Sequence, residues 1–179
     1  MKVLKFGGTS VGTVESLSHV KRIVEGLDEQ VIVVVSALGG ITDQLIATAQ
    51  MASKGDSAYL ENYAKIIERH NVVINGMVPV ECQLDVRSIT GPLLEELGNI
   101  YRGVSLIKDL SPRTLDIVVS YGERLSSVII SRVIDGAVHF DSRNFIKTER
   151  QFNKHIVDSE TTGVTSCLPG RNSSLKNNA

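Results

Sequence analysis

A short polar segment near the N-terminus carries the residues best suited to bind an anion. Lys5 stands two residues before the pair Gly7 and Gly8, and the hydroxyl residues Thr9 and Ser10 follow directly. Glycine accepts positive φ and lets other groups approach the backbone, so a turn at this pair can present its amide N–H groups. The positive end of a following helix would point at the same place. This arrangement predicts a phosphate-like anion site to which Lys5 adds a full positive charge.

The flanking residues predict a strand, a glycine turn and a helix in that order. Val3, Leu4 and Phe6 form a short apolar run that is too brief for a helix and typical of a buried strand. A helical spacing of apolar side chains starts at Val14, and Thr9 and Ser10 are the expected N-caps. Neither of the two commoner phosphate-loop patterns is present. The plain alternative is a close-packed turn without a ligand, with Lys5 held in solvent.

A second strand and helix are predicted directly afterwards. Residues 31–35 are five β-branched residues in succession, which is typical of a strand buried on both faces. A small, glycine-rich loop follows at 36–40, and Thr42 is the expected cap of the next helix. The order strand, helix, strand, helix predicts a parallel sheet with right-handed crossovers.

The middle of the chain is predicted to be helical. Residues 57–110 contain no convincing strand and carry two helical stripes, which predict a hairpin interrupted at Gly91-Pro92. Ser111-Pro112 predicts a fresh helix start, with a kink or break at Tyr121-Gly122. Residues 136–140 read as a third strand.

Composition argues for a globular protein with a reduced, cytoplasmic setting. The chain has 179 residues, 42% of them hydrophobic, with 19 basic against 20 acidic side chains. A net charge of −1 gives no reason to expect a nucleic-acid or membrane partner. No signal peptide or membrane-length apolar run is present. Cys82 and Cys167 are too few for a disulfide framework, and the four histidines show no metal-ligand spacing.

Two regions are expected along the chain. Residues 1–158 carry all the periodic segments, whereas residues 159–179 are rich in Ser, Thr, Asn and Gly and predict loop or disorder. No repeat indicates a second folded domain. Three predicted strands are fewer than the mean sheet of about five or six, so the fold is expected to be incomplete, with open sheet edges.

Several of these segments together resemble one enzyme family. Lys-Phe-Gly-Gly-Thr-Ser-Val at residues 5–11 is similar to the signature of the aspartokinases, within the wider amino acid kinase family. Residues 35–42 resemble the substrate loop of that family, and residues 119–127 resemble its Gly-Glu motif. Residues 140–148 are similar to the segment that follows. The resemblance covers about residues 1–150.

The resemblance implies a fold and a reaction. The fold would be a three-layer α/β/α arrangement with a mainly parallel sheet, present as its N-terminal part. The reaction would be transfer of the ATP γ-phosphoryl group to the side-chain carboxylate of L-aspartate, the first step toward lysine, threonine and methionine. ATP with Mg²⁺ would be a co-substrate, and no prosthetic group or protein-bound metal is expected. Lys5 and the amides of Gly7, Gly8, Thr9 and Ser10 would hold the phosphates.

The same resemblance implies the residues that bind the amino acid. Glu123 would pair with the substrate ammonium group, while Ser36 and Thr42 would donate to a carboxylate. Each has a plainer role as well, because Ser36 can simply end a strand, Thr42 can cap a helix, and Glu123 can be a solvated first-turn acid. Arg171 would grip the α-carboxylate.

The tail departs from the family pattern. Ser174 and Leu175 stand where the family has Ser-Asp, and no acidic residue follows Glu160. Two alternatives therefore stay open: a non-catalytic, ligand-binding or dimerising fragment, and another acyl-phosphate-forming kinase that acts on glutamate or acetylglutamate. The setting of Glu123 argues against the second. A homo-oligomer is expected for the intact protein.

Overall fold

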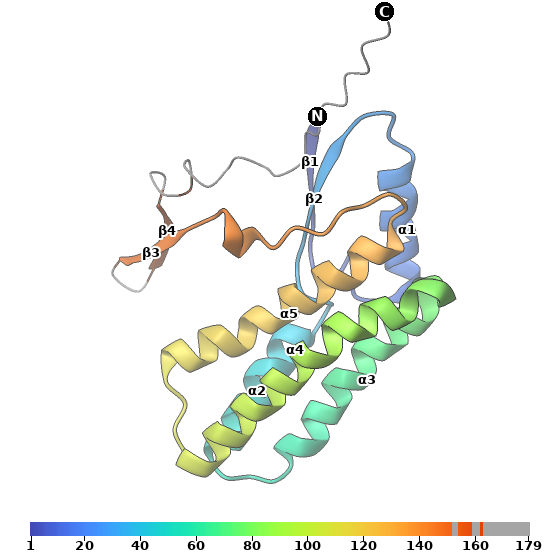
Figure 1. Ribbon diagram of the computed structural model, residues 1–179. Coiled ribbons are helices and arrows are strands. Elements are labelled where there is room, and N and C mark those ends of the chain that lie inside the picture. Colours follow the sequence, from blue (N-terminus) through green and yellow to red (C-terminus); the bar gives the residue numbers. More distant parts are fainter. Residues whose placement is uncertain (152–153, 159–161, 163–179) are drawn as a thin grey trace, which may run out of the picture. The chain divides into compact units, whose positions relative to one another are not determined.

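The computed structural model describes residues 1–151, 154–158 and 162. The chain divides into two compact units, residues 1–139 and 140–179. The first unit contains, in order, β1 (Lys2–Phe6), α1 (Val14–Glu25), β2 (Val31–Val35), α2 (Ile41–Ser53), α3 (Tyr59–Met77), α4 (Val80–Ile107) and α5 (Pro112–Val133) (Figure 1). Its fold is an α/β fold, mostly helical, with a small parallel sheet.

The sheet of the first unit pairs β1 with β2 in parallel. The register runs from Lys2 opposite Val31 to Phe6 opposite Val35, and α1 forms the crossover between the two strands. This confirms the predicted order of strand, helix, strand and helix. The carboxyl ends of both strands therefore open toward the same side, where the two glycine-rich loops follow.

The two faces of this sheet differ in burial. On one face Leu4, Phe6 and the odd-numbered valines of β2 pack against the core. On the other face the side chains of Val3, Ile32 and Val34 are 64%, 44% and 45% exposed. The prediction of a second strand buried on both faces is therefore wrong for the described chain, because no described helix covers the side that carries Ile32 and Val34.

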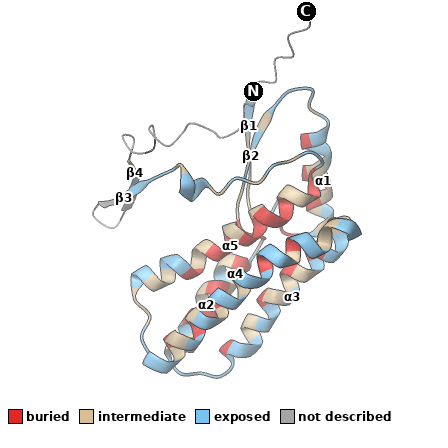
Figure 2. Ribbon diagram, viewed as in Figure 1, coloured by how far each residue is buried: buried red, intermediate tan, exposed pale blue. Residues whose placement is uncertain are grey.

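Helices α2 to α5 form the main core of this unit. The buried residues of these helices lie mainly on the sides turned toward one another, and the outward sides are exposed (Figure 2). Helices α3 and α4 lie side by side, which confirms the predicted helical hairpin (Figure 1).

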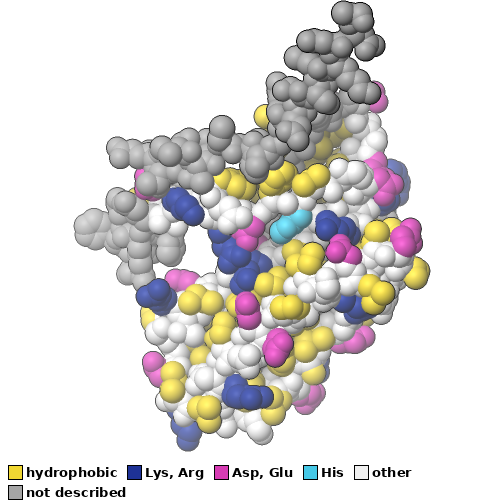
Figure 3. Space-filling view, in the orientation of Figure 1, with side chains coloured by type: hydrophobic (Ala, Val, Ile, Leu, Met, Phe, Trp, Pro, Cys, Tyr) yellow, Lys and Arg dark blue, Asp and Glu magenta, His cyan; other side chains and the backbone are white. Residues whose placement is uncertain are grey.

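On the face drawn in Figure 3, the positive and negative side chains of the described residues are interspersed among hydrophobic ones. Among the described helices, none combines the length and apolarity of a membrane span.

Two predicted helix interruptions are wrong. Helix α4 runs from Val80 to Ile107 with Pro92 inside it, and α5 runs from Pro112 to Val133 through Gly122. In α4 the buried residues Val86, Thr90, Leu97, Tyr101 and Val104 lie on both sides of the proline. Continuous packing along this stripe outweighs the backbone hydrogen bond that proline cannot make.

The helix starts show where local signals worked and where they failed. Ser111 caps α5 by accepting a hydrogen bond from the Thr114 amide, with Pro112 directly after it, as predicted. The N-cap of α1 is Thr13, so the predicted caps Thr9 and Ser10 are wrong. Helix α2 has Gly40 as its N-cap, and the predicted cap Thr42 is wrong as well.

Gly40 explains the second error. Its φ of +81° lies in the left-handed region that favours glycine, and it starts the helix two residues before Thr42. Thr42 consequently lies inside the first turn, where no side-chain capping bond forms.

Residues 136–140 do not form the predicted third strand in the structure. A turn at Gly136, with φ of +71°, follows α5, and none of the described strands pairs with this segment. In the second unit a short 3₁₀ helix, η1 (Ser142–Asn144), precedes β3 (Thr148–Gln151) and β4 (Lys154–Val157), which pair antiparallel. The proposed boundary at residue 158 and the properties of residues 159–179 stay predictions, since nearly all of the latter lie outside the described residues.

Candidate active site

Three glycines bring the loops after β1 and β2 into backbone contact. A Cβ placed on Gly12 would lie 2.9 Å from the Gly8 carbonyl oxygen and 3.2 Å from the Gly39 Cα. A Cβ on Gly8 would lie 3.1 Å from the Ala37 carbonyl oxygen. Any larger residue at these positions would push the two loops apart. The sequence therefore places the Lys5–Ser10 segment directly against the 36–40 loop.

The middle of α5 closes against the same loop. A Cβ on Gly122 would lie only 2.7 Å from the Cβ of Ala37, and the Ser126 hydroxyl donates a 2.8 Å hydrogen bond to the Ser36 carbonyl. Glycine at 122 thus permits a close helix–loop approach, which replaces the predicted helix break. Glu123 follows Gly122 on α5, and its side chain is exposed.

The cation and the amides of the first segment gather at one turn. Lys5 is exposed, and its ammonium nitrogen would lie 3.9 Å from a Cβ on Gly7. Within the described residues, Lys5 forms no ion pair, and the amides of Gly7, Gly8 and Thr9 donate to no acceptor. These groups therefore remain available to an anion, and their role in phosphate binding stays a prediction.

Ser10 differs from its three neighbours. Its amide donates a 2.9 Å hydrogen bond to the Gly7 carbonyl, which closes a β-turn. The prediction that this amide faces a ligand is therefore wrong, although the Ser10 hydroxyl remains half-exposed. The amides of the turn are also not those of a helix N-terminus, since α1 begins only at Val14.

The residues predicted to bind the amino acid lie around the same loop, as far as they are described. Ser36 is half-buried at the end of β2, and Thr42 is half-buried in the first turn of α2. Glu123 is exposed on α5, next to Gly122, which is the residue that contacts the loop. Arg171 lies outside the described residues.

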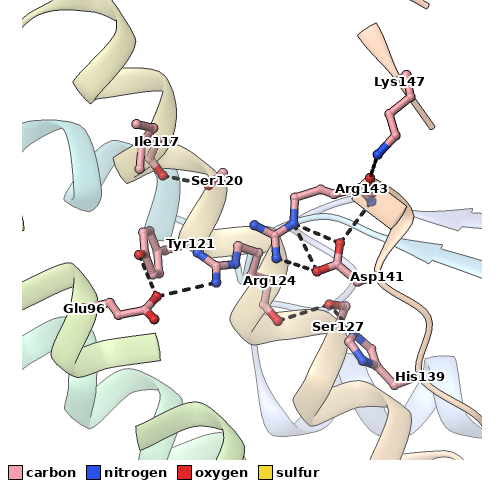
Figure 4. A network of polar contacts seen from close by, with 10 residues as sticks. All are labelled: Glu96, Ile117, Ser120, Tyr121, Arg124, Ser127, His139, Asp141, Arg143 and Lys147. Carbon is pink, nitrogen blue, oxygen red and sulfur yellow. Dashed lines mark hydrogen bonds and ion pairs between the residues drawn. The ribbon is translucent and has the colours of Figure 1, made fainter. Parts of the chain in front are cut away.

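A polar network beside Glu123 was not predicted. The Arg124 guanidinium lies 4.3 Å from the centre of the Tyr121 ring, and the Tyr121 hydroxyl donates a 3.0 Å hydrogen bond to Glu96 of α4 (Figure 4). Arg124 and Glu96 also form an ion pair at 3.7 Å. Burial raises the pKa of the Tyr121 hydroxyl, so it stays protonated and donates. The three-residue spacing of Tyr121 and Arg124 was a visible signal, but the partner on α4 was not.

Other contacts in the same view belong to each unit separately. Within the first unit, the Ser127 hydroxyl lies 3.1 Å from Nε2 of His139 (Figure 4). Within the second, Arg143 forms an ion pair with Asp141, and the Lys147 ammonium donates to the Arg143 carbonyl. The first contact joins α5 to the segment that follows it, and the other two lie within residues 141–147.

A pocket of about 220 Å³ adjoins the turn on the side of α1. It is lined by Phe6, Ser10, Ser16, His19, Val20 and Ile23. Among the described residues there is no cluster of three or more His, Cys, Asp or Glu side chains suited to a metal ion. The turn and the adjoining loop therefore offer amides, hydroxyls and one lysine, which suit an anionic substrate.

Comparison with known proteins now decides the family. The sequence matches the amino acid kinase family over residues 1–168. The chain belongs to the amino acid kinase family.

Two plant members of this family illustrate the similarity. Aspartokinase 2, chloroplastic, of Arabidopsis thaliana is 28% identical over 176 residues, which cover 94% of this chain and 32% of the relative. Aspartokinase 1, chloroplastic, of the same plant is 30% identical, over 93% of this chain and 30% of the relative. The chain thus spans about a third of the length of these curated relatives.

Solved structures of the family agree with the fold. The crystal structure of E. coli aspartokinase III in complex with aspartate and ADP matches with a TM-score of 0.81 at 25% identity. The structure of the same enzyme with lysine and aspartate matches with a TM-score of 0.79. Both comparisons cover 94% of this chain and 37% of the other. The amino-acid-kinase fold is therefore shown, as the N-terminal part of a larger arrangement in those relatives.

Proposed function

We propose that this chain supplies the phosphate-binding turn and part of the amino-acid site of an aspartate kinase. The observation that carries the proposal is the meeting of three segments: the Lys5–Ser10 turn, the 36–40 loop and α5 at Gly122. They bring an ammonium group and unpaired amides against the 36–40 loop, and the same loop contacts α5 one residue before Glu123. The resemblance to aspartokinases, one of them solved with aspartate and ADP, supports the same reading.

The proposed reaction forms a mixed anhydride. A side-chain carboxylate oxygen of L-aspartate attacks the γ-phosphorus of ATP, the bond to the β–γ bridging oxygen breaks, and ADP leaves. The aspartate carboxylate has an ordinary pKa of about 3.9, so it is ionised at neutral pH and needs no general base. The barrier lies in bringing one anion to another, which makes positioning and positive charge the main contributions of the protein.

Each phosphate-binding group has a distinct part in this proposal. The Lys5 ammonium stabilises negative charge on the oxygens of the transferring group. The amides of Gly7, Gly8 and Thr9 donate to other phosphate oxygens, and Ser10 contributes its hydroxyl. Mg²⁺ would enter as part of the nucleotide substrate, held by phosphates and water, which agrees with the oxygen ligands and retained waters it prefers.

The amino-acid side of the site is proposed from the same loop. Glu123 pairs with the substrate ammonium group, and the hydroxyls of Ser36 and Thr42 donate to a carboxylate. Arg171 is proposed to grip the α-carboxylate. A role in lysine, threonine and methionine synthesis, a cytoplasmic location and a homo-oligomeric parent remain part of the same proposal.

One specific observation supports a second candidate function, a module without catalytic activity. Because the chain spans about a third of its curated relatives, it can act as a ligand-binding or dimerising module without turnover. Such a module would still bind nucleotide phosphate at the same turn. Binding and turnover therefore have to be measured separately.

The deciding experiment removes the lysine charge at the turn. Lys5→Ala is expected to weaken ADP binding by calorimetry and, where the protein turns over, to slow formation of the acyl phosphate, trapped with hydroxylamine, by about 100- to 1000-fold. Lys2→Ala is the matched control, since Lys2 lies on the same strand and pairs with Glu29 at 2.7 Å. Equal ADP affinity for Lys5→Ala and the unsubstituted chain would refute the proposed site. Nucleotide binding without turnover would select the non-catalytic module.

A further inference from the structure

An arginine on α3 contacts the segment that follows the phosphate-binding turn. A guanidinium N–H of Arg69 donates to the carbonyl of Gly12, which lies between the turn and α1. Gly12 is buried, and Arg69 is half-buried. Among the described residues, Arg69 has no carboxylate partner, so this carbonyl is the one acceptor the structure gives it.

Two further contacts tie the same helix to the start of α1. A Cβ on Gly76 would lie 2.8 Å from a methyl carbon of Val14, so the Val14 side chain packs directly against the backbone of α3 there. The Ser18 hydroxyl lies 3.5 Å from the Met77 sulfur. Helix α3 thus contacts this segment at Gly12, Val14 and Ser18.

Gly12 contacts both α3 and the phosphate-binding turn. Its Cα region is packed against the Gly8 carbonyl oxygen and the Gly39 backbone, with spaces too small for a methyl group. In a close-packed site, a shift of the Gly12 peptide must therefore displace Gly8 or Gly39. The Val11 amide, which donates 3.3 Å to the Gly8 carbonyl, would move with them.

We propose that Arg69 is a positioning residue for the phosphate-binding turn and acts through the Gly12 carbonyl. The inference rests on the proposed function for its ligand, nucleotide phosphate. Arginine suits this part because its planar fork holds an acceptor in a defined direction, which a flexible lysine ammonium does not. The residue sets the direction of the amides of Gly7, Gly8 and Thr9 without contacting the nucleotide.

The test uses Arg69→Met, Arg69→Lys and a matched control. Arg87→Met is that control, since Arg87 also lies half-buried between α3 and α4 but donates to Asn71 and Asn75, at 2.6 Å each, away from the turn. ADP and aspartate affinities are measured by calorimetry, and exchange of the Ser10 and Val11 amides is measured by NMR. Circular dichroism checks that each variant is folded.

Arg69→Met is expected to weaken ADP binding about tenfold and to speed exchange of both amides by a similar factor. Aspartate affinity should change less than about twofold, and Arg69→Lys should recover only part of the loss. Arg87→Met should leave the ADP affinity and both exchange rates unchanged. This pattern separates positioning of the turn from general stability.

Two results would overturn the inference. One is unchanged exchange of Ser10 and Val11 in Arg69→Met. The other is an equal effect of Arg69→Met and Arg87→Met on both ligands and on the melting temperature, which would show a merely structural arginine. If the unsubstituted chain does not bind ADP, the proposed function fails, and the exchange rates still decide whether Arg69 orders the turn.

Discussion

The first unit has two kinds of packing, and they serve different ends. At the candidate site, Gly8, Gly12 and Gly39 let backbone lie against backbone, and Gly122 lets α5 lie against the Ala37 side chain. In the helical core, Tyr101 packs instead against other aromatic rings, with centroids 6.5 Å from Tyr59 and 5.8 Å from Tyr63.

The comparison shows how the unit separates binding from stability. Glycine contacts bury little apolar area, but they leave amides and Lys5 open to a ligand. The aromatic cluster buries large side chains and satisfies their polar ends: the Tyr101 hydroxyl donates 3.2 Å to the Leu45 carbonyl. Burial raises the pKa of the Tyr101 hydroxyl, so it stays a hydrogen-bond donor in the physiological range. We therefore expect substitutions at the glycine contacts to affect ligand binding, and substitutions in the aromatic cluster to affect stability alone.

The largest effect on stability is expected at the aromatic cluster. Tyr101 is fully buried, so Tyr101→Ala should lower the free energy of unfolding by about 3–5 kcal/mol, measured by urea denaturation. Tyr101→Phe removes only the hydroxyl and should cost about 1 kcal/mol. ADP affinity of the folded protein should stay the same. A selective loss of ADP binding in Tyr101→Phe would contradict the separation of the two regions.

At the glycine contacts, Gly12→Ala should cost about 1–3 kcal/mol, because the new methyl group meets the backbone of Gly8 and Gly39. The same change should weaken ADP binding. Gly103→Ala is the control: its Cβ meets nothing within 4 Å inside α4, and it should stabilise the protein by about 0.5–1 kcal/mol. A loss of stability in Gly12→Ala together with a gain in Gly103→Ala would confirm that close approach, rather than helix propensity, makes Gly12 necessary.

The cap of α1 gives a smaller effect next to the site. Thr13 Oγ1 accepts from the Ser16 amide at 3.0 Å, and Ser16 Oγ accepts from the Thr13 amide at 3.0 Å. Thr13→Ala should lower stability by about 1 kcal/mol. Thr42→Ala, in the first turn of α2 without a capping bond, should cost less in the same denaturation series. A larger loss of stability in Thr42→Ala than in Thr13→Ala would indicate that Thr42 does cap α2.

The smallest effect is expected at His70, where protonation of one buried imidazole changes the stability of the protein. His70 of α3 is fully buried, and its Nε2 has no hydrogen-bond partner among the described residues. Burial lowers its pKa below the ordinary 6.5, and the nearby Arg69 charge acts in the same direction, against the hydrogen bond to the Ile66 carbonyl. The unfolded chain therefore binds this proton more readily than the folded one, and stability falls as the pH drops below about 6.5.

His70→Leu should flatten the pH dependence of the unfolding free energy over that window. His19→Gln, at an exposed histidine of α1, is the matched control that removes a second imidazole. An unaltered slope in His70→Leu would show that other groups carry the acid sensitivity.

Local sequence patterns predicted the elements whose signals are short-range. The apolar run of β1, the β-branched run of β2, the start of α1 at Val14 and the Ser111-Pro112 start of α5 all agree with the structure. The signature at residues 5–11 also indicated the family that the comparison then showed. These features depend on neighbours a few residues apart, which the sequence displays directly.

The errors have a common physical source. Pro92 and Gly122 look like helix breakers in isolation, but packing against other elements keeps α4 and α5 continuous. Residues 136–140 have a strand-like composition and no described partner strand. Helix and strand propensities are worth tenths of a kcal/mol to about one per residue, so tertiary contacts decide such cases.

The sequence by itself determined the chemistry that is present: a lysine, a glycine turn, two hydroxyl-bearing loops and a glutamate, in an order typical of one family. Only the tertiary structure decided that Gly12 and Gly39 meet, that Gly122 lies against Ala37, and that Arg69 reaches the Gly12 carbonyl. Those contacts join residues far apart in the chain, and their energies come from close approach in three dimensions, which no local pattern encodes.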